Sequence, residues 1–111
     1  MKKFGATIRN LREREGISLR KFAEAVGISP TYVSKVERDE FAPPGEETIR
    51  KIAQILKQDE DWLLGLAGKV SSDLPEIVQN RPQLMATFLR KAGKLSDESI
   101  AKLLKNMDKM R

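Results

Sequence analysis

Two predicted helices are separated by only three residues, Gly27, Ile28 and Ser29. Ser18 is suited to cap the first helix, and Ser29 the second, with Pro30 at the first helical position. A glycine in so short a connection accepts a positive φ without steric cost and turns the chain sharply. Two helices joined in this way cross at a steep angle, so the sequence predicts a helix-turn-helix.

The apolar residues elsewhere also recur at helical spacing, without alternating runs, and this predicts an all-α fold. We expect five helices within residues 1–68, a linker over residues 69–73, and a short helical extension over residues 74–111. The expected helices cover about 3–15, 18–26 and 29–38, begin near 46 and at 59, and then cover 74–80, 82–92 and 96–110.

The composition excludes several classes of function. The chain has no cysteine and no histidine, which rules out disulfides, thiol nucleophiles, histidine bases and almost every zinc site. Its clustered carboxylates stand at expected helix starts, where the helix dipole explains them. We therefore expect no enzyme and no metal or cofactor site. No apolar run approaches the roughly 20 residues that span a bilayer, so we expect a cytoplasmic protein without a membrane partner.

The net charge of +5 fits a polyanionic partner, although lysines that simply face water would give the same charge. The side of the third helix opposite its apolar residues is polar and partly cationic. It carries Pro30, Thr31, Ser34, Lys35 and Arg38. A capped helix with such a face is typical of one that enters the major groove of DNA.

The residue types on this face suit base and phosphate contacts. Lys35 can donate to guanine, Thr31 and Ser34 can donate and accept, and the Thr31 methyl can touch a thymine methyl. Ser29 and the amides at the helix start suit a phosphate, and Arg38 suits a phosphate or a base.

Neighbouring residues of the third helix and of the loop after it have more than one interpretation. Tyr32 is either half-buried packing or a phosphate donor. Asp39 and Glu40 would repel a phosphate, so we expect them to point away into the loop, with Phe41 and Pro43 packed beneath that loop. Trp62, in the fifth expected helix, is interpreted as a core residue or a dimer contact.

Residues 4–66 resemble the helix-turn-helix domain of the Cro/CI-type repressors, the XRE family. The pattern comprises "SPTYVSKVER", "PPGEETIRKIAQIL" and Ala23, Gly27, Ile28, Val33, Val36 and Glu37. The resemblance implies a five-helix, lambda-repressor-like domain that binds double-stranded DNA and regulates transcription, with repression the expected outcome. It also implies an ion pair between Arg12 and Glu37, which we interpret as structural in preference to a pair of DNA contacts.

The chain departs from the family pattern at two places. Leu19 stands where many members have a phosphate-binding glutamine, so Ser18 or Arg20 is expected to make that contact. On the recognition face, Pro30, Thr31 and Lys35 replace the glutamines that phage repressors often carry, so no phage operator sequence is implied.

The C-terminal residues carry two apolar stripes that three short helices cannot bury well alone. These stripes contain Leu84, Met85, Phe88 and Leu89, then Ile100, Leu103, Leu104 and Met107. They fold back on the fifth helix, form a two-fold interface, or dock another protein; a homodimer on a palindromic operator is the expected arrangement. The alternative function is an antitoxin-like or adaptor module that uses the same fold to bind a protein.

Overall fold

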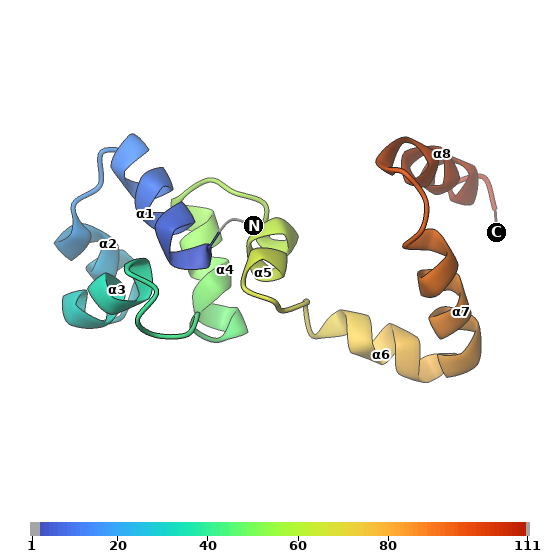
Figure 1. The fold of residues 1–111 in the computed structure, drawn as a ribbon, viewed down its shortest axis with the longest axis horizontal. Coiled ribbons are helices and arrows are strands. Elements are labelled where there is room, and N and C mark those ends of the chain that lie inside the picture. Colours follow the sequence, from blue (N-terminus) through green and yellow to red (C-terminus); the bar gives the residue numbers. More distant parts are fainter. Residues whose placement is uncertain (1–2, 111) are drawn as a thin grey trace. The chain divides into compact units, whose positions relative to one another are not determined.

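The computed structural model describes residues 3–110, and every regular element within this range is an α-helix (Figure 1). The chain divides into two units, Met1–Ser71 and Ser72–Arg111. Unit 1 contains α1 (Phe4–Arg14), α2 (Leu19–Val26), α3 (Pro30–Glu37), α4 (Glu46–Ile55) and α5 (Glu60–Leu66). Unit 2 contains α6 (Asp73–Asn80), α7 (Pro82–Ala92) and α8 (Asp97–Met107). The all-α prediction is therefore confirmed, with helix ends close to those expected.

Unit 1 is built around one apolar core to which all five of its helices or their ends contribute. α3 packs against α1 and α2, α2 also packs against α4, and α4 packs against α5 (Figure 1). The core comprises Phe4, Ile8, Phe22, Ala23, Val26, Val33, Val36, Ile49, Ile52, Ala53, Leu56, Leu63 and Leu64. These residues leave α3 with a buried inner side and an outer side free for other contacts.

The connection between α2 and α3 has the predicted capping. The Ser18 hydroxyl oxygen accepts from the amide of Lys21 at 3.2 Å, and the Ser29 hydroxyl oxygen accepts from the amide of Tyr32 at 3.1 Å. Gly27 ends α2 with φ of 88°, a left-handed conformation that favours glycine. Both ends of the turn are thus fixed by local hydrogen bonds, and this sets the direction of α3.

The start of α1 lies unusually close to the end of α3. The amide of Gly5 donates to Asp39 Oδ1 at 3.0 Å, so a carboxylate satisfies a backbone donor in the first turn of α1. A Cβ atom on Gly5 would lie 2.0 Å from the Val36 carbonyl oxygen. Only glycine allows this approach, which locks α1 onto the helix that carries the polar face.

The boundary between the units, after Ser71, falls within residues 69–73. Ser71 is buried at the end of unit 1, where its hydroxyl oxygen accepts from Arg50 of α4 at 2.6 Å. Arg50 also pairs with Glu46 one turn earlier. Asp73 already lies in α6. The hydrogen bond from Arg50 therefore ties the end of unit 1 to α4.

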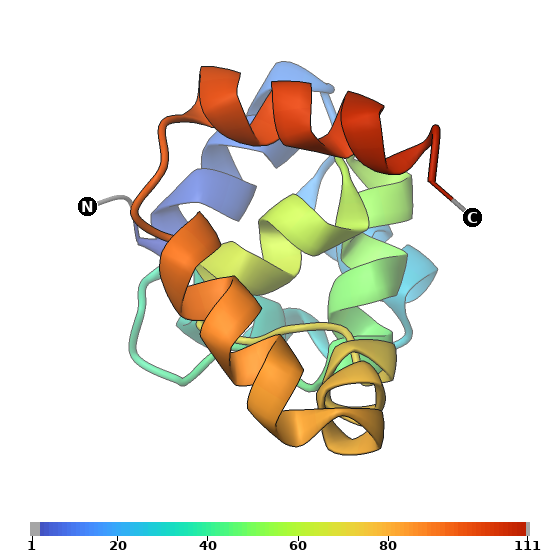
Figure 2. The same ribbon diagram turned by 90° about the vertical axis from the view of Figure 1, so that its right-hand side faces the viewer.

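Unit 2 has no core of its own among its described residues. α6 packs against α7. Figure 2 shows α7 in orange and α8 in red as two helices joined by a loop. No residue of α6, α7 or α8 is buried. Its exposed large apolar residues are Leu74, Ile77, Leu84, Phe88, Leu89, Leu95, Leu104, Met107 and Met110. Within residues 3–110, none of the helices combines the length and the apolar character that crossing a membrane would need.

Candidate nucleic-acid interface

The outer side of α3 presents the predicted residues as one continuous face. Val33, Val36 and Glu37 point inwards and are buried. On the opposite side Pro30, Thr31 and Arg38 are exposed, and Tyr32, Ser34 and Lys35 are half-buried. Ser29, also exposed, begins the helix. The structure therefore brings these seven predicted residues together on or beside one helical face. Three of them are partly covered by neighbouring side chains.

Phe41 lies against the recognition face instead of beneath the loop, which corrects the sequence-based expectation. The residue is 46% exposed, and its ring centroid is 5.8 Å from that of Tyr32 and 5.1 Å from the Lys35 Nζ. Of the two prolines that follow in the loop, Pro43 is half-buried and Pro44 is buried. One edge of the face is thus formed by an aromatic ring from a residue outside α3.

Three acidic residues at the end of α3 are each held by a donor, two of them by groups of α1 and one by Arg38. Glu37 is buried against Arg12, and Asp39 accepts from the amide of Gly5. Glu40 pairs with Arg38 at 3.1 Å on the surface. Asp39 thus points towards α1 and not into the loop, and Glu40 stays beside the face. Lys35 has no carboxylate partner among the residues that the structure describes.

Arg12 and Glu37 form the buried ion pair that the family resemblance implies. Arg12 Nε donates to Glu37 Oε2 at 2.7 Å, and Nη2 donates to Oε1 at 3.0 Å. Nη1 donates to the carbonyl of Ile17 at 2.8 Å, in the turn before α2. Hydrogen bonding to Glu37 raises the pKa of Arg12, and the loss of hydration on burial opposes this only in part. One guanidinium therefore ties together α1, α3 and the start of the helix-turn-helix.

A polar hollow of about 210 Å³ borders the other edge of the face. It is lined by Arg9, Arg12, Leu19, Ser34, Glu37 and Arg38. Arg9 pairs with Glu13 at 3.5 Å, but both side chains remain about half exposed. Two exposed guanidiniums beside the Ser34 hydroxyl suit a phosphate group. Leu19 contributes only its apolar side chain here, so Arg9 is a phosphate-binding candidate beside Ser18 and Arg20.

Ser18 and Arg20 stand at the start of α2. Both are exposed. The Ser18 oxygen already accepts the capping hydrogen bond, and its hydroxyl proton remains available to donate. No ion pair holds Arg20 within residues 3–110. The start of α2 is thus positioned by its cap while its polar groups stay accessible.

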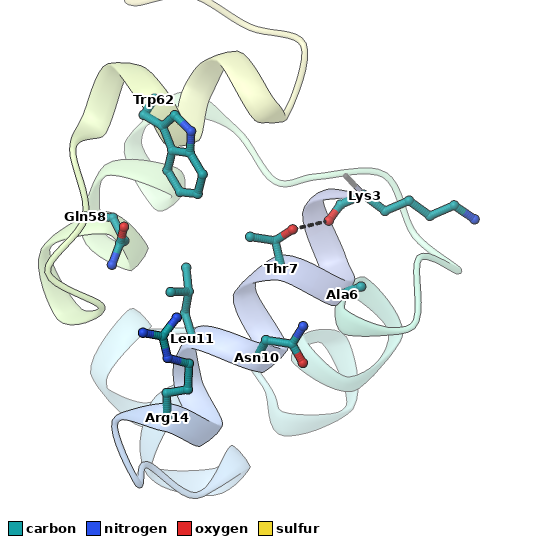
Figure 3. Close-up of a pocket in the computed structure, with 8 residues that line it drawn as sticks. All are labelled: Lys3, Ala6, Thr7, Asn10, Leu11, Arg14, Gln58 and Trp62. Carbon is teal, nitrogen blue, oxygen red and sulfur yellow. Dashed lines mark hydrogen bonds between the residues drawn. The ribbon is translucent and has the colours of Figure 1, made fainter. Parts of the chain in front are cut away.

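A second hollow, of about 420 Å³, lies between α1 and the residues Gln58 and Trp62 (Figure 3). It is lined by Lys3, Ala6, Thr7, Asn10, Leu11, Arg14, Gln58 and Trp62. In Figure 3 the ring of Trp62 points towards α1, with Leu11 below it, and the side chain of Lys3 points away from the hollow. Trp62 is 43% exposed. The expectation of a core role for Trp62 is therefore wrong, because the neighbouring Leu63 and Leu64 fill the core.

Comparisons with known proteins agree with this geometry. A family model described as "Helix-turn-helix" matches residues 8–63, from the middle of α1 to α5. The chain belongs to the Cro/CI-type helix-turn-helix (XRE) family. An XRE relative, the uncharacterised HTH-type transcriptional regulator RghRB of Bacillus subtilis (strain 168), is 32% identical over 77 residues. That match covers 69% of this chain, which spans about half (55%) of the length of RghRB.

Two solved XRE structures share the fold of unit 1. SinR, a master regulator for biofilm formation crystallised in complex with DNA, is 30% identical with a TM-score of 0.51, over 55% of this chain and 97% of its own. The P22 c2 repressor, in complex with a synthetic operator, is 28% identical with a TM-score of 0.52, over 57% of this chain and 94% of its own. The lambda-repressor-like fold expected from the sequence is therefore confirmed.

Proposed function

We propose that this protein is a sequence-specific DNA-binding transcriptional repressor that inserts α3 into the major groove. The observation that carries the proposal is the outer face of α3. Thr31, Lys35 and Arg38 share this face. Of the three carboxylates nearest to it, Glu37 and Asp39 are held by groups of α1, and Glu40 pairs with Arg38 on the surface. A rigid cationic helix face with hydroxyl groups is complementary to base edges between two rows of phosphates.

Roles for the individual residues follow from their positions. Lys35 and Thr31 read base edges, and Ser34 and Arg38 contact a base or the adjacent phosphate. Ser29 with the first amides of α3, and Ser18, Arg20 and Arg9 around the start of α2, bind phosphates. Arg12 and Glu37 make no DNA contact in this scheme; they hold the angle between α1 and α3.

Self-association of unit 2 completes the proposal. Nine large apolar side chains of this unit are exposed, an arrangement that water disfavours. A second copy offers the same apolar surface, so a two-fold dimer buries both at once. Such a dimer presents two copies of α3 to half-sites about 34 Å apart on a palindromic operator. Relatives named as repressors and regulators support the regulatory outcome.

Selection of bound sequences from a random DNA pool tests the function directly. We expect a palindromic consensus with half-sites about one helical turn apart, bound with an affinity that falls steeply as salt rises. Enrichment of no sequence, together with tight binding to a protein partner that salt hardly affects, would instead support the adaptor function that the exposed apolar residues of unit 2 also suit.

A further inference from the structure

Phe41 is the one aromatic residue on the recognition face that comes from outside α3. The amides of Glu40 and Phe41 donate to the Lys35 carbonyl at 2.9 and 3.3 Å, which continues the end of α3 into the loop. This places the Phe41 ring 5.8 Å from Tyr32, tilted by 49°, and 5.1 Å from the Lys35 amine. The backbone hydrogen bonds therefore fix the position of the Phe41 main chain, and its ring contacts Tyr32 and Lys35 although 46% of the residue is exposed.

The ring restricts Lys35, which otherwise has a long and flexible side chain. A lysine amine within about 6 Å of a ring centroid is attracted to the electron-rich face of the ring. Lys35 is half-buried and lacks a carboxylate partner in the described part of the chain, so this is the contact that orients its amine. A lysine that is already oriented loses less freedom when it donates to a base.

The exposed part of the ring can be covered by an apolar group of the DNA. The major groove offers one such group, the C5 methyl of thymine. Successive base pairs are about 3.4 Å apart along the helix axis. Because the Lys35 amine lies 5.1 Å from the ring centroid, the two side chains reach the same base pair or adjacent ones.

We propose that Phe41 is a specificity-determining residue that contacts a thymine methyl beside the guanine read by Lys35. This inference rests on the proposed DNA-binding function and deepens it. Lys35 and Phe41 then recognise two adjacent bases together: the amine of Lys35 selects guanine, and the ring of Phe41 selects the neighbouring thymine. The loop after α3, and not the helix alone, then sets part of the operator sequence.

Deoxyuridine substitution tests this contact one methyl group at a time. Each thymine of the selected half-site is replaced by deoxyuridine, and binding of the full chain is measured by fluorescence anisotropy. At one thymine next to a guanine, we expect the loss of the methyl to weaken wild-type binding by about fourfold. The Phe41→Ala variant should bind the thymine site more weakly and show no further loss on the deoxyuridine site.

Two further variants keep the test specific. Phe41→Leu retains an apolar group but no ring, so it should remain sensitive to the thymine methyl while its preference for guanine weakens. Thr31→Ala removes a methyl group on α3 that could contact the same thymine. In this variant, replacing the thymine by deoxyuridine should still weaken binding as much as in the wild type. Thermal melts followed by circular dichroism check that each variant is folded, which we expect because Phe41 lies outside the core.

The outcomes separate this inference from the function beneath it. A wild-type protein that selects a sequence, but whose deoxyuridine effects all persist in Phe41→Ala, overturns the role of Phe41 and leaves DNA recognition intact. A selected half-site with no thymine beside a guanine also overturns it. Failure of the wild-type chain to select any sequence overturns the proposed function itself.

Discussion

Arg12 and Glu37, which are 25 positions apart, meet in two hydrogen bonds with both residues less than a tenth exposed. The pair holds the end of α3 against α1 from beneath, while the residues that face outwards remain free. A buried, two-pronged pair fixes an orientation more firmly than apolar packing alone, because each charge is costly without the other. The outer face of α3 is in this sense supported by an ion pair buried on the opposite side of the helix.

Removing one member of this pair is predicted to destabilise unit 1 strongly. Arg12→Met or Glu37→Leu should each lower the free energy of unfolding by about 3–5 kcal/mol, because the remaining charge stays buried and unpaired. The double variant should regain much of this loss. Urea unfolding followed by fluorescence measures the change. Arg9→Met is the matched control, since its exposed pair with Glu13 contributes less than about 1 kcal/mol.

The pH dependence of this pair follows from its arginine. The pKa of Arg12 is raised, so its contribution to stability is complete below the ordinary arginine range and is lost only as the pH rises through the raised value. Neutral to moderately alkaline conditions should therefore leave the arginine's contribution intact. A marked loss of stability between neutral and mildly alkaline pH, absent in Arg12→Met, would contradict this assignment.

Two glycines in helices of unit 1 should respond to alanine in opposite ways. Gly5→Ala places a Cβ atom against the Val36 carbonyl and should destabilise by about 1–3 kcal/mol or more, because backbone must move. Gly65→Ala in α5 meets open space and should stabilise by up to about 1 kcal/mol. Thermal unfolding of both variants checks the prediction, and equal effects would show that α1 does not approach α3 this closely.

Lys35→Ala is expected to weaken specific DNA binding by about 1–3 kcal/mol and to relax the preference at one base pair. Lys69→Ala removes the same charge from an exposed position outside the candidate interface and should leave the selected sequence unchanged. Selection from a random pool with each variant gives the readout. An unaltered consensus for Lys35→Ala would remove Lys35 from base recognition.

Glu40→Gln is expected to strengthen DNA binding. The substitution frees Arg38 from its surface pair and removes a negative charge beside the phosphates, so affinity should rise roughly two- to fivefold at low salt. The gain should shrink as salt rises, because exposed charges are screened. Glu76→Gln, which makes the same change of charge in unit 2, should give no comparable gain in anisotropy titrations.

Deleting residues 74–111 is expected to leave a folded but monomeric and weaker DNA-binding protein. Every buried apolar residue of the described chain lies in unit 1, so that unit should retain a cooperative melt. Sedimentation equilibrium should show the full chain as a dimer and the truncated chain as a monomer. A truncated chain that still dimerises would place the interface in unit 1.

The sequence predicts the local features of this fold well and its long-range contacts poorly. Ser18, Gly27, Ser29 and Pro30 act on neighbouring residues, so their capping and turn roles can be inferred from spacing alone. The Arg12–Glu37 pair was predicted only from the family resemblance, because the spacing of two charges that are distant in the sequence does not require them to meet. The close approach of Gly5 to Val36 was not predicted for the same reason.

Phe41 and Trp62 show where pattern-based inference fails. Phe41 stands in a loop without periodicity, and its place beside Lys35 depends on two backbone hydrogen bonds that follow the end of α3. α5 has only seven residues, too few for helical spacing to decide whether Trp62 or Leu64 faces inwards. In both cases the missing information is which distant segment covers the side chain.

Trp62 is an intrinsic fluorescent probe located in unit 1. It is the only tryptophan, and the only tyrosine, Tyr32, lies in the same unit, so unit 2 contributes no tryptophan or tyrosine emission. Tryptophan fluorescence therefore reports on unit 1, whereas far-ultraviolet circular dichroism detects the helices of both units. Two melting curves from one sample, without any dye, reveal whether the halves of the chain lose their structure together.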